Sequence, residues 1–347
     1  MEAMLAEAPL RSSALKDQMV GLVCASLASS TWAKYEAGWA AFDNFQQQGG
    51  KKFTWPLANE TIRDFAIWCV SVKKLQPGTA STYLQALSMA HKLKGLGKMG
   101  GMKDELLDLI LKGAERDPSK QGYGQDKVGR RVVSLPLLRV LGHKLANSGG
   151  DPTSNQTIWA ACTVAFFTSA RMGEWLAPSE ASFDPTTTLT WQDIKFRKDG
   201  SILIHIKNPK SGTKGGEFLD IFGFPGFGCC PVQALAKHKD LQEAAGLAHS
   251  WGPVFRLADG KNLSGPQLNK SLKSLLTGVL DYKKDGVFCH SFRASVASTL
   301  ARFPDLASSE DVKGWGRWDS SCYLRYSRLK LDRKRQIFDK IAHALRQ

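Results

Sequence analysis

Apolar residues at three-to-four spacing dominate the first third of the chain and predict a run of helices over residues 13–116. One of these helices carries Trp32 and Trp39 on the same face, and two more begin at Asn59 and Pro77. Large aromatic side chains at such positions are typical of a buried core. The pattern therefore predicts a helical bundle that folds around its own core.

The helical pattern stops between residues 117 and 133, where glycines, a proline and several basic residues replace the apolar positions. Such a composition is typical of a linker. Helical patterning resumes at Ser134, and an apolar run then predicts a buried helix over 157–170. We divide the chain into a tail, a helical bundle, a basic linker and a second domain, at residues 1–12, 13–116, 117–133 and 134–347.

A different pattern follows the buried helix. Segments rich in β-branched residues at 189–191, 201–206 and 217–221 predict a small antiparallel sheet with a basic hairpin tip. Further helices are predicted over 231–246, 266–280 and 329–345. The second domain is therefore expected to be mixed α+β, and the chain as a whole mainly α. The apolar stripe of the last helix could close its own domain or dock onto a neighbouring subunit.

Charge narrows the class of partner. The 347 residues carry a formal net charge of +15, which favours a large anionic partner, and nucleic acid over a membrane. The longest apolar stretch, 158–170, is shorter than the ~20 residues that span a bilayer. The first ten residues lack the basic flank and apolar run of a secretory signal. We expect an intracellular protein, in the nucleus of a eukaryote or otherwise in the cytoplasm or nucleoid.

The seven cysteines form no C-x-x-C pair, and several lie in apolar contexts, so we expect reduced, buried thiols. The adjacent Cys229 and Cys230 have no matching His or Cys spacing nearby, which disfavours a metal site. We expect no metal, no cofactor and no small-molecule substrate.

The stretch 289–328 holds the densest set of groups suited to a phosphate. His290 and Arg293 lie three residues apart, a planar guanidinium clamps two phosphate oxygens, and an imidazole moves protons near neutral pH. Gly314 and Gly316 predict a turn over residues 314–318, followed by Tyr323 and Tyr326 on another helix. Each tyrosine could be a buried amphipathic ring or a nucleophile.

Three earlier residues suit the same chemistry. Arg171 follows the buried helix directly, and Glu174 could either form a structural ion pair with it or orient it towards a phosphate. Lys210 lies at the predicted hairpin tip, where an ammonium is either solvated or a proton donor to a departing sugar oxygen.

The order His-x-x-Arg, Gly-x-Trp and Tyr resembles the C-terminal box of the tyrosine recombinases, the phage-integrase-like enzymes, with a Cre-like two-domain architecture. With the earlier positions added, the resemblance runs from about residue 13 to the end of the chain. It implies a helical core-binding clamp (a SAM-like bundle) followed by a catalytic domain of the DNA breaking-rejoining fold. It also implies site-specific cutting and rejoining of double-stranded DNA through a 3′-phosphotyrosyl intermediate, by a tetramer on two DNA sites.

The resemblance implies a role for each site residue. Arg171 and Arg293 grip the scissile phosphate, Lys210 is the general acid, and His290 and Trp318 handle a proton and donate a hydrogen bond. Glu174 supports the site from behind. Tyr326 is the nucleophile, and Tyr323 is the alternative. The DNA contacts that we expect outside this site are Lys34, Thr79, Thr82, Gln85, Lys92, Lys94, Arg130 and Arg131.

The sequence departs from the family pattern at two points. Trp318 stands where His is more frequent, and it still offers one N–H donor. The family's usual gap from this position to the tyrosine is nine residues, whereas Tyr326 lies eight residues after Trp318 and Tyr323 five. The Gly-Arg-Trp and Tyr-x-Arg-Tyr boxes resemble those of eukaryotic mobile elements of the DIRS and Crypton groups, which implies an element-encoded enzyme.

Other functions remain open. The polar stripe from Thr79 to Gln85 leads to a basic end that begins with His91 and Lys92. It could be a solvated face or could lie on DNA. A catalytically inactive DNA-binding regulator of the same fold would keep the charge and lose the chemistry. A type IB topoisomerase-like enzyme would share the chemistry and relax supercoils as a monomer.

Overall fold

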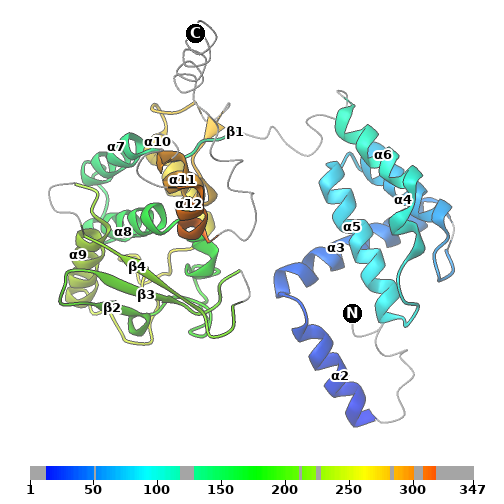
Figure 1. Ribbon diagram of the computed structural model, residues 1–347, viewed down its shortest axis with the longest axis horizontal. Coiled ribbons are helices and arrows are strands. Elements are labelled where there is room, and N and C mark those ends of the chain that lie inside the picture. The colour runs from blue at the N-terminus through cyan, green and yellow to red at the C-terminus, as the bar shows by residue number, and fades with distance from the viewer. Residues whose placement is uncertain are drawn as a thin grey trace, which may run out of the picture. The chain divides into compact units, whose positions relative to one another are not determined.

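The chain divides into two compact units, Met1–Lys127 and Val128–Gln347, each with its own hydrophobic core. The boundary falls within the range 117–133 that we predicted as the linker. Among the described residues, no helix is long and apolar enough to cross a membrane. The computed structural model (Figure 1) describes residues 13–50, 52–117, 129–210, 213–223, 228–281, 285–300 and 308–317.

The described part of unit 1 is helical, as the apolar spacing predicts. A close helix contact joins α3 and α5 at Gly38, where a Cβ atom would lie 2.7 Å from the Cβ of Ala86. Trp39 Nε1 donates a hydrogen bond across the same contact to the Ala86 carbonyl, at 2.8 Å. The elements are α2 (Ser13–Ala25), α3 (Ser29–Gln48), α4 (Asn59–Ser71), α5 (Pro77–Leu93), η1 (Gly100–Lys103) and α6 (Glu105–Arg116).

The structure corrects the prediction of an exposed basic end of α5 at one residue, His91. The sequence places it at the basic end of a polar stripe, but the structure buries it at 2% exposure. The Leu57 N–H donates to its Nε2 at 3.3 Å, and its ring meets Trp55 edge-on. Burial lowers the pKa of His91, which favours the neutral ring. The exposed basic end of α5 is therefore formed by Lys92 rather than by His91.

Unit 2 is built around α8 (Pro152–Thr168), which is buried along most of its length because nearly every side chain on it is small or apolar. In Figure 1 this helix lies between the sheet and the pair α7 and α10. Asp151 caps it by accepting a hydrogen bond from the Ser154 N–H at 2.8 Å. The other helices are α7 (Leu135–Ala146), η3 (Met172–Glu174), η4 (Trp191–Asp193), α9 (Pro231–Ala244), α10 (Gly265–Leu276), η5 (Cys289–Ala294), α11 (Ser295–Leu300) and α12 (Ser309–Gly316).

The predicted antiparallel sheet is confirmed, in the order β2 (Ile194–Phe196), β3 (Ile202–Ile206) and β4 (Glu217–Ile221). In β3 the residues Ile202, Ile204 and Ile206 alternate inward and are buried. The strand predicted over 189–191 was wrong. The backbone N–H and the hydroxyl of Thr190 donate to Asp193, which closes a 3₁₀ turn there instead, and β2 starts after it.

A second, two-stranded pairing joins β1 (Gly129–Arg130) to β5 (Asp285–Gly286) in parallel. Val133, which follows β1, is buried at 1% exposure in the core of unit 2. The described end of the predicted linker range therefore packs as part of unit 2. Residues 118–128 of that range lie outside the described residues.

The turn predicted over 314–318 was partly wrong, because residues 314–316 form the last turn of α12. Ser308 and Asp311 form a capping box that starts this helix, and Val312 is buried beneath it. These interactions outweigh the intrinsic cost of two glycines, about 1 kcal/mol each. The chain turns one residue later, at Arg317, which has a left-handed φ of 53°.

His238 makes the stability of unit 2 depend on pH. It is fully buried between Trp191 and Phe255, and its Nε2–H donates to the Val254 carbonyl at 2.9 Å. Burial lowers the pKa of His238 to about 4 from 6.5. Below pH 6.5 the unfolded chain takes up a proton that the folded one does not, so stability falls as the pH falls towards 4.

We expect unit 2 to lose about 2 kcal/mol of unfolding free energy through this residue between pH 7 and pH 5. Urea titrations of wild type and His238→Gln at both pH values measure it. Glutamine keeps a donor for the Val254 carbonyl but does not titrate, so the variant should show a smaller difference between the two pH values. An equal pH dependence in both proteins would contradict the assignment.

Candidate active site

The position of Arg171 is set by the end of α8. Ser169 takes a left-handed φ of 52° and is fully buried, so the chain leaves the helix abruptly. Arg171 then precedes the 3₁₀ turn η3, in which Glu174 accepts hydrogen bonds from the Arg171 backbone N–H at 3.3 Å and from Nη1 at 3.1 Å. The Glu174 side chain is 4% exposed and that of Arg171 34%. The buried carboxylate thus orients a partly exposed guanidinium.

Glu174 also joins two further segments. Its Oε1 accepts from the backbone N–H of Lys210 at 2.9 Å, and its Oε2 accepts from Nη2 of Arg317. Burial alone would raise the pKa of Glu174, but the Lys210 N–H and the nearby Arg317 charge outweigh burial and lower the pKa below its ordinary value. Glu174 is therefore ionised at neutral pH and binds three segments of unit 2.

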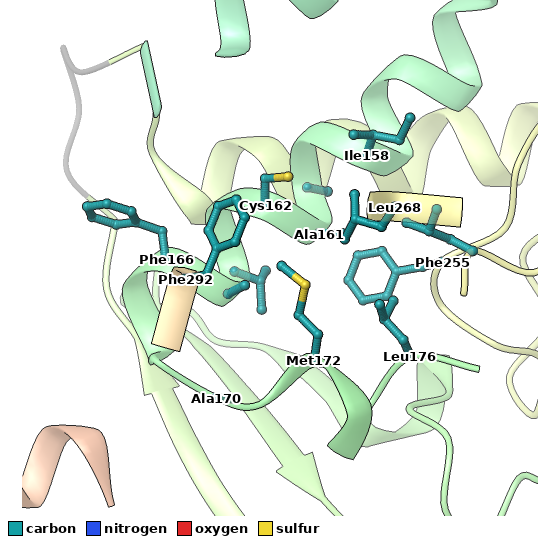
Figure 2. Packing of buried hydrophobic residues seen from close by; sticks show 14 of the residues in the cluster. Ile158, Ala161, Cys162, Phe166, Ala170, Met172, Leu176, Phe255, Leu268 and Phe292 are labelled. Atoms are coloured by element: carbon teal, nitrogen blue, oxygen red, sulfur yellow. The ribbon is translucent and has the colours of Figure 1, made fainter. Parts of the chain in front are cut away.

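Arg293 lies on η5, three residues after His290, and its side chain runs into the interior at 2% exposure. Its Nη1 donates to the carbonyl of Ser169, 124 positions earlier in the chain, and its Nη2 to the carbonyl of Arg317 at 3.4 Å. The neighbouring Phe292 belongs to the buried cluster that includes Cys162 and Phe166 of α8 (Figure 2). Core packing of η5 on α8 thus places Arg293 against the turn that precedes Arg171.

These contacts bring together Arg171, Glu174, Arg293 and the backbone of Lys210. His290 lies on the same short helix as Arg293 and is exposed, as is Lys210. Trp318, Tyr323 and Tyr326 lie outside the described residues. Their assignments remain predictions from the sequence.

Two residues of this network were not predicted from the sequence. Arg317 donates through Nη2 to Glu174 and through Nη1 to Glu217, the first residue of β4. The Gly-Arg-Trp box drew attention to this segment, but nothing in the sequence names Glu217 as a partner 100 positions away.

Cys289 lies beside His290, and a thiol there is a second possible nucleophile. Burial raises the pKa of Cys289 to about 12, so the thiol stays protonated and is a poor nucleophile at neutral pH. It lines a cavity of about 370 Å³ together with Glu174, Asn208 and Gly265. Within the described ranges, no cluster of three or more metal-ligating side chains is present.

The predicted DNA-contact residues outside this site lie in different surroundings. Lys34, Gln85, Lys92 and Arg131 are exposed, and Thr79 is half-buried. The hydroxyl of Thr82 donates to the Gly78 carbonyl at 2.9 Å, and Lys94 Nζ lies 5.6 Å from the ring centre of Trp55. The side chain of Arg130 is not among those described.

No protein-family model matches the chain, and no curated protein matches it in sequence. Its fold is similar to that of the Tn1549 transposon integrase in complex with transposon right-end DNA. The TM-score is 0.58 at 13% identity, over 91% of this chain and 95% of that one.

Two other solved structures are similar. One is the XerH site-specific recombinase bound to palindromic difH substrate, with a TM-score of 0.55 at 12% identity over 89% of this chain and 78% of that one. The other is a lambda integrase dimer bound to a COC′ core site, with a TM-score of 0.53 at 14% identity over 90% and 75%. The fold predicted from the sequence is confirmed as the fold of the tyrosine recombinases.

Proposed function

We propose that this protein cuts and rejoins double-stranded DNA at specific sites through a 3′-phosphotyrosyl intermediate, with Tyr326 as the nucleophile. The observation that carries the proposal is the convergence of Arg171 and Arg293 on the turn at Ser169, from distant parts of the sequence. Cationic groups fixed at one point by buried partners are suited to a phosphate that gains charge during a reaction.

The two guanidinium groups would act on the non-bridging phosphate oxygens. A phosphodiester resists attack because its negative charge repels the nucleophile and grows in the transition state. Each positioned donor that offsets this charge is worth about 10²- to 10³-fold in rate, by analogy with oxyanion donors. Arg293 has five N–H donors, and two of them donate hydrogen bonds to carbonyls. These two bonds fix the plane of its guanidinium group.

In the proposed cleavage step, the Tyr326 phenolic oxygen bonds to phosphorus and the bond from phosphorus to the 5′ oxygen breaks. His290 takes the phenolic proton, Lys210 gives a proton to the departing 5′ oxygen, and Trp318 donates a hydrogen bond to the phosphate. The phosphotyrosyl ester keeps the energy of the broken linkage. A second 5′ hydroxyl can therefore attack it and rejoin a strand without ATP.

The contacts of two lysines favour Lys210 as the general acid. Lys207 directly follows β3, and its Nζ donates to Asp193 at 2.6 Å and to the Pro185 carbonyl at 2.5 Å, so it is held in a structural ion pair. The Lys210 side chain is exposed, while its backbone N–H is fixed by Glu174. A proton donor needs this combination of a fixed backbone and a side chain that can reach the DNA.

The partner and the assembly follow from the same proposal. A net charge of +15 suits a DNA duplex, and the exposed residues Lys34, Gln85, Lys92 and Arg131 supply phosphate and base contacts. The neighbouring structures include recombinases and integrases bound to DNA, one of them as a dimer. We propose a homotetramer on two DNA sites, encoded by a mobile element.

Covalent trapping tests the proposal. The protein is incubated with a pool of duplexes of random sequence, each nicked so that the cut strand diffuses away, and then denatured in detergent. We expect an adduct that survives denaturation and is enriched in one sequence. Binding without any adduct would favour the inactive regulator. Adducts on all sequences, with relaxation of a supercoiled plasmid, would favour the topoisomerase-like enzyme.

A further inference from the structure

Arg317 has a backbone conformation that is unusual for a residue other than glycine. It follows α12 with a φ of 53°, in the left-handed region where helices most often place glycine. An arginine there pays a steric cost that a glycine would avoid. The position therefore indicates that the side chain makes contacts that offset this cost.

The side chain makes those contacts with two acids. Nη1 donates to Glu217 and Nη2 to Glu174, and the side chains of the three residues are 13%, 18% and 4% exposed. A planar guanidinium can meet two carboxylates that approach from different directions, whereas an ammonium is a point charge. Without Arg317, Glu217 and Glu174 would each lose a charged partner in a largely buried setting.

The backbone of Arg317 adds a third contact, because its carbonyl accepts from Nη2 of Arg293 at 3.4 Å. One residue is therefore linked to most of the candidate site. Through Glu174 it is linked to the Arg171 guanidinium and the Lys210 backbone. Through Glu217 it reaches the start of β4, and Glu217 pairs with Ile206 in the strand that leads to Lys210.

We infer that Arg317 is a positioning residue that fixes the hairpin bearing Lys210 against the Glu174 carboxylate. The inference rests on the proposed function, in which Lys210 gives its proton to the departing 5′ oxygen. Arg317 itself contacts two carboxylates, so it acts through Glu174 and Glu217 and not on the phosphate.

The test uses the duplex enriched by covalent trapping, in two forms. One has the ordinary phosphodiester, and in the other sulfur replaces the bridging 5′ oxygen at the cut. A thiolate leaves without a proton, because the pKa of a thiol lies far below that of an alcohol hydroxyl. Loss of the general acid therefore slows the first substrate much more than the second.

We expect Arg317→Gln to form adduct on the oxygen substrate about 10²-fold more slowly than wild type, a loss typical of a displaced catalytic group. On the sulfur substrate the loss should shrink to within about threefold. Lys210→Ala should show the same rescue, and Arg171→Ala should not. Arg317→Lys should resemble Arg317→Gln on the oxygen substrate, because one ammonium cannot meet both carboxylates.

Arg197→Gln is the matched control, because Arg197 pairs with Asp220 at 2.6 Å on the same sheet and lies outside the site. It should behave as wild type on both substrates. If Arg317→Gln does not fold, Glu217→Gln removes one of the two anchors and should show the same rescue by sulfur.

A wild-type rate for Arg317→Gln on the oxygen substrate would overturn the inference, and so would equal losses on both substrates. A wild-type protein that cleaves neither substrate would instead overturn the proposed function. The two failures are thus distinguishable.

Discussion

Replacing Tyr326 by phenylalanine is expected to abolish the covalent adduct while DNA binding stays within about twofold of wild type. The change removes the one oxygen that would bond to phosphorus and keeps the ring. Loss of a covalent nucleophile costs at least about 10³-fold in rate. Affinity is shared among many cations of this chain, whose net charge is +15, and none of them is changed.

Tyr323→Phe is the matched control, because it removes the same atom from the other tyrosine of the box. Adduct yield after detergent denaturation, and a gel-shift affinity measured on the same duplex, separate chemistry from binding. We expect Tyr323→Phe to form adduct at close to the wild-type level. If the two variants exchange behaviour, Tyr323 is the nucleophile, and full adduct in both would end the phosphotyrosyl proposal.

The helices that could be predicted from the sequence are those with strong apolar periodicity. The starts predicted at Asn59 and Pro77 are the starts of α4 and α5, and the buried run at 157–170 corresponds to most of α8. The helix α12 was not predicted, because two glycines in three residues indicate a turn when only neighbouring residues are considered. Its capping box and the burial of Val312 decide the structure, and burial depends on residues far away in the sequence.

The candidate site likewise has a part that could be predicted from the sequence and a part that could not. The residues that carry charge could be predicted from motif order, and the structure brings Arg171, Glu174 and Arg293 together. The contacts that orient them could not be predicted, because they depend on tertiary packing. Arg293 reaches the Ser169 carbonyl only because Phe292 packs in the core that includes α8, and Arg317 meets Glu217 only once β4 has paired with β3.

Burial also explains why one polar residue was misread. His91 follows a stripe of Thr, Ser and Gln and precedes a lysine, so the local pattern indicates a solvated basic end. The structure instead places its ring against Trp55, with Nε2 accepting from the Leu57 N–H. The aromatic partner comes from the segment between α3 and α4, and no periodicity within α5 reports it.

Arg171→Ala is expected to slow adduct formation by about 10²- to 10³-fold, the cost of removing one donor to a charged transition state. The fold should survive, because Glu174 keeps its bonds from the Lys210 N–H and from Arg317. The Arg171 side chain is 34% exposed, so its loss opens no sealed cavity in the core. Adduct yield and gel-shift affinity on the trapped duplex measure the two effects separately.

The role of Arg171 is decided by the ratio between the loss of cleavage rate and the loss of DNA affinity. Arg197→Ala, which removes a guanidinium of equal exposure from an ion pair on the sheet, should lose little of either. In Arg171→Ala we expect cleavage to fall far more than affinity, because the positioned guanidinium acts on charge that develops only during the reaction. Equal losses of cleavage and affinity would make Arg171 a binding residue, since a group that stabilises the bound DNA and the transition state alike leaves the rate of the bound complex unchanged.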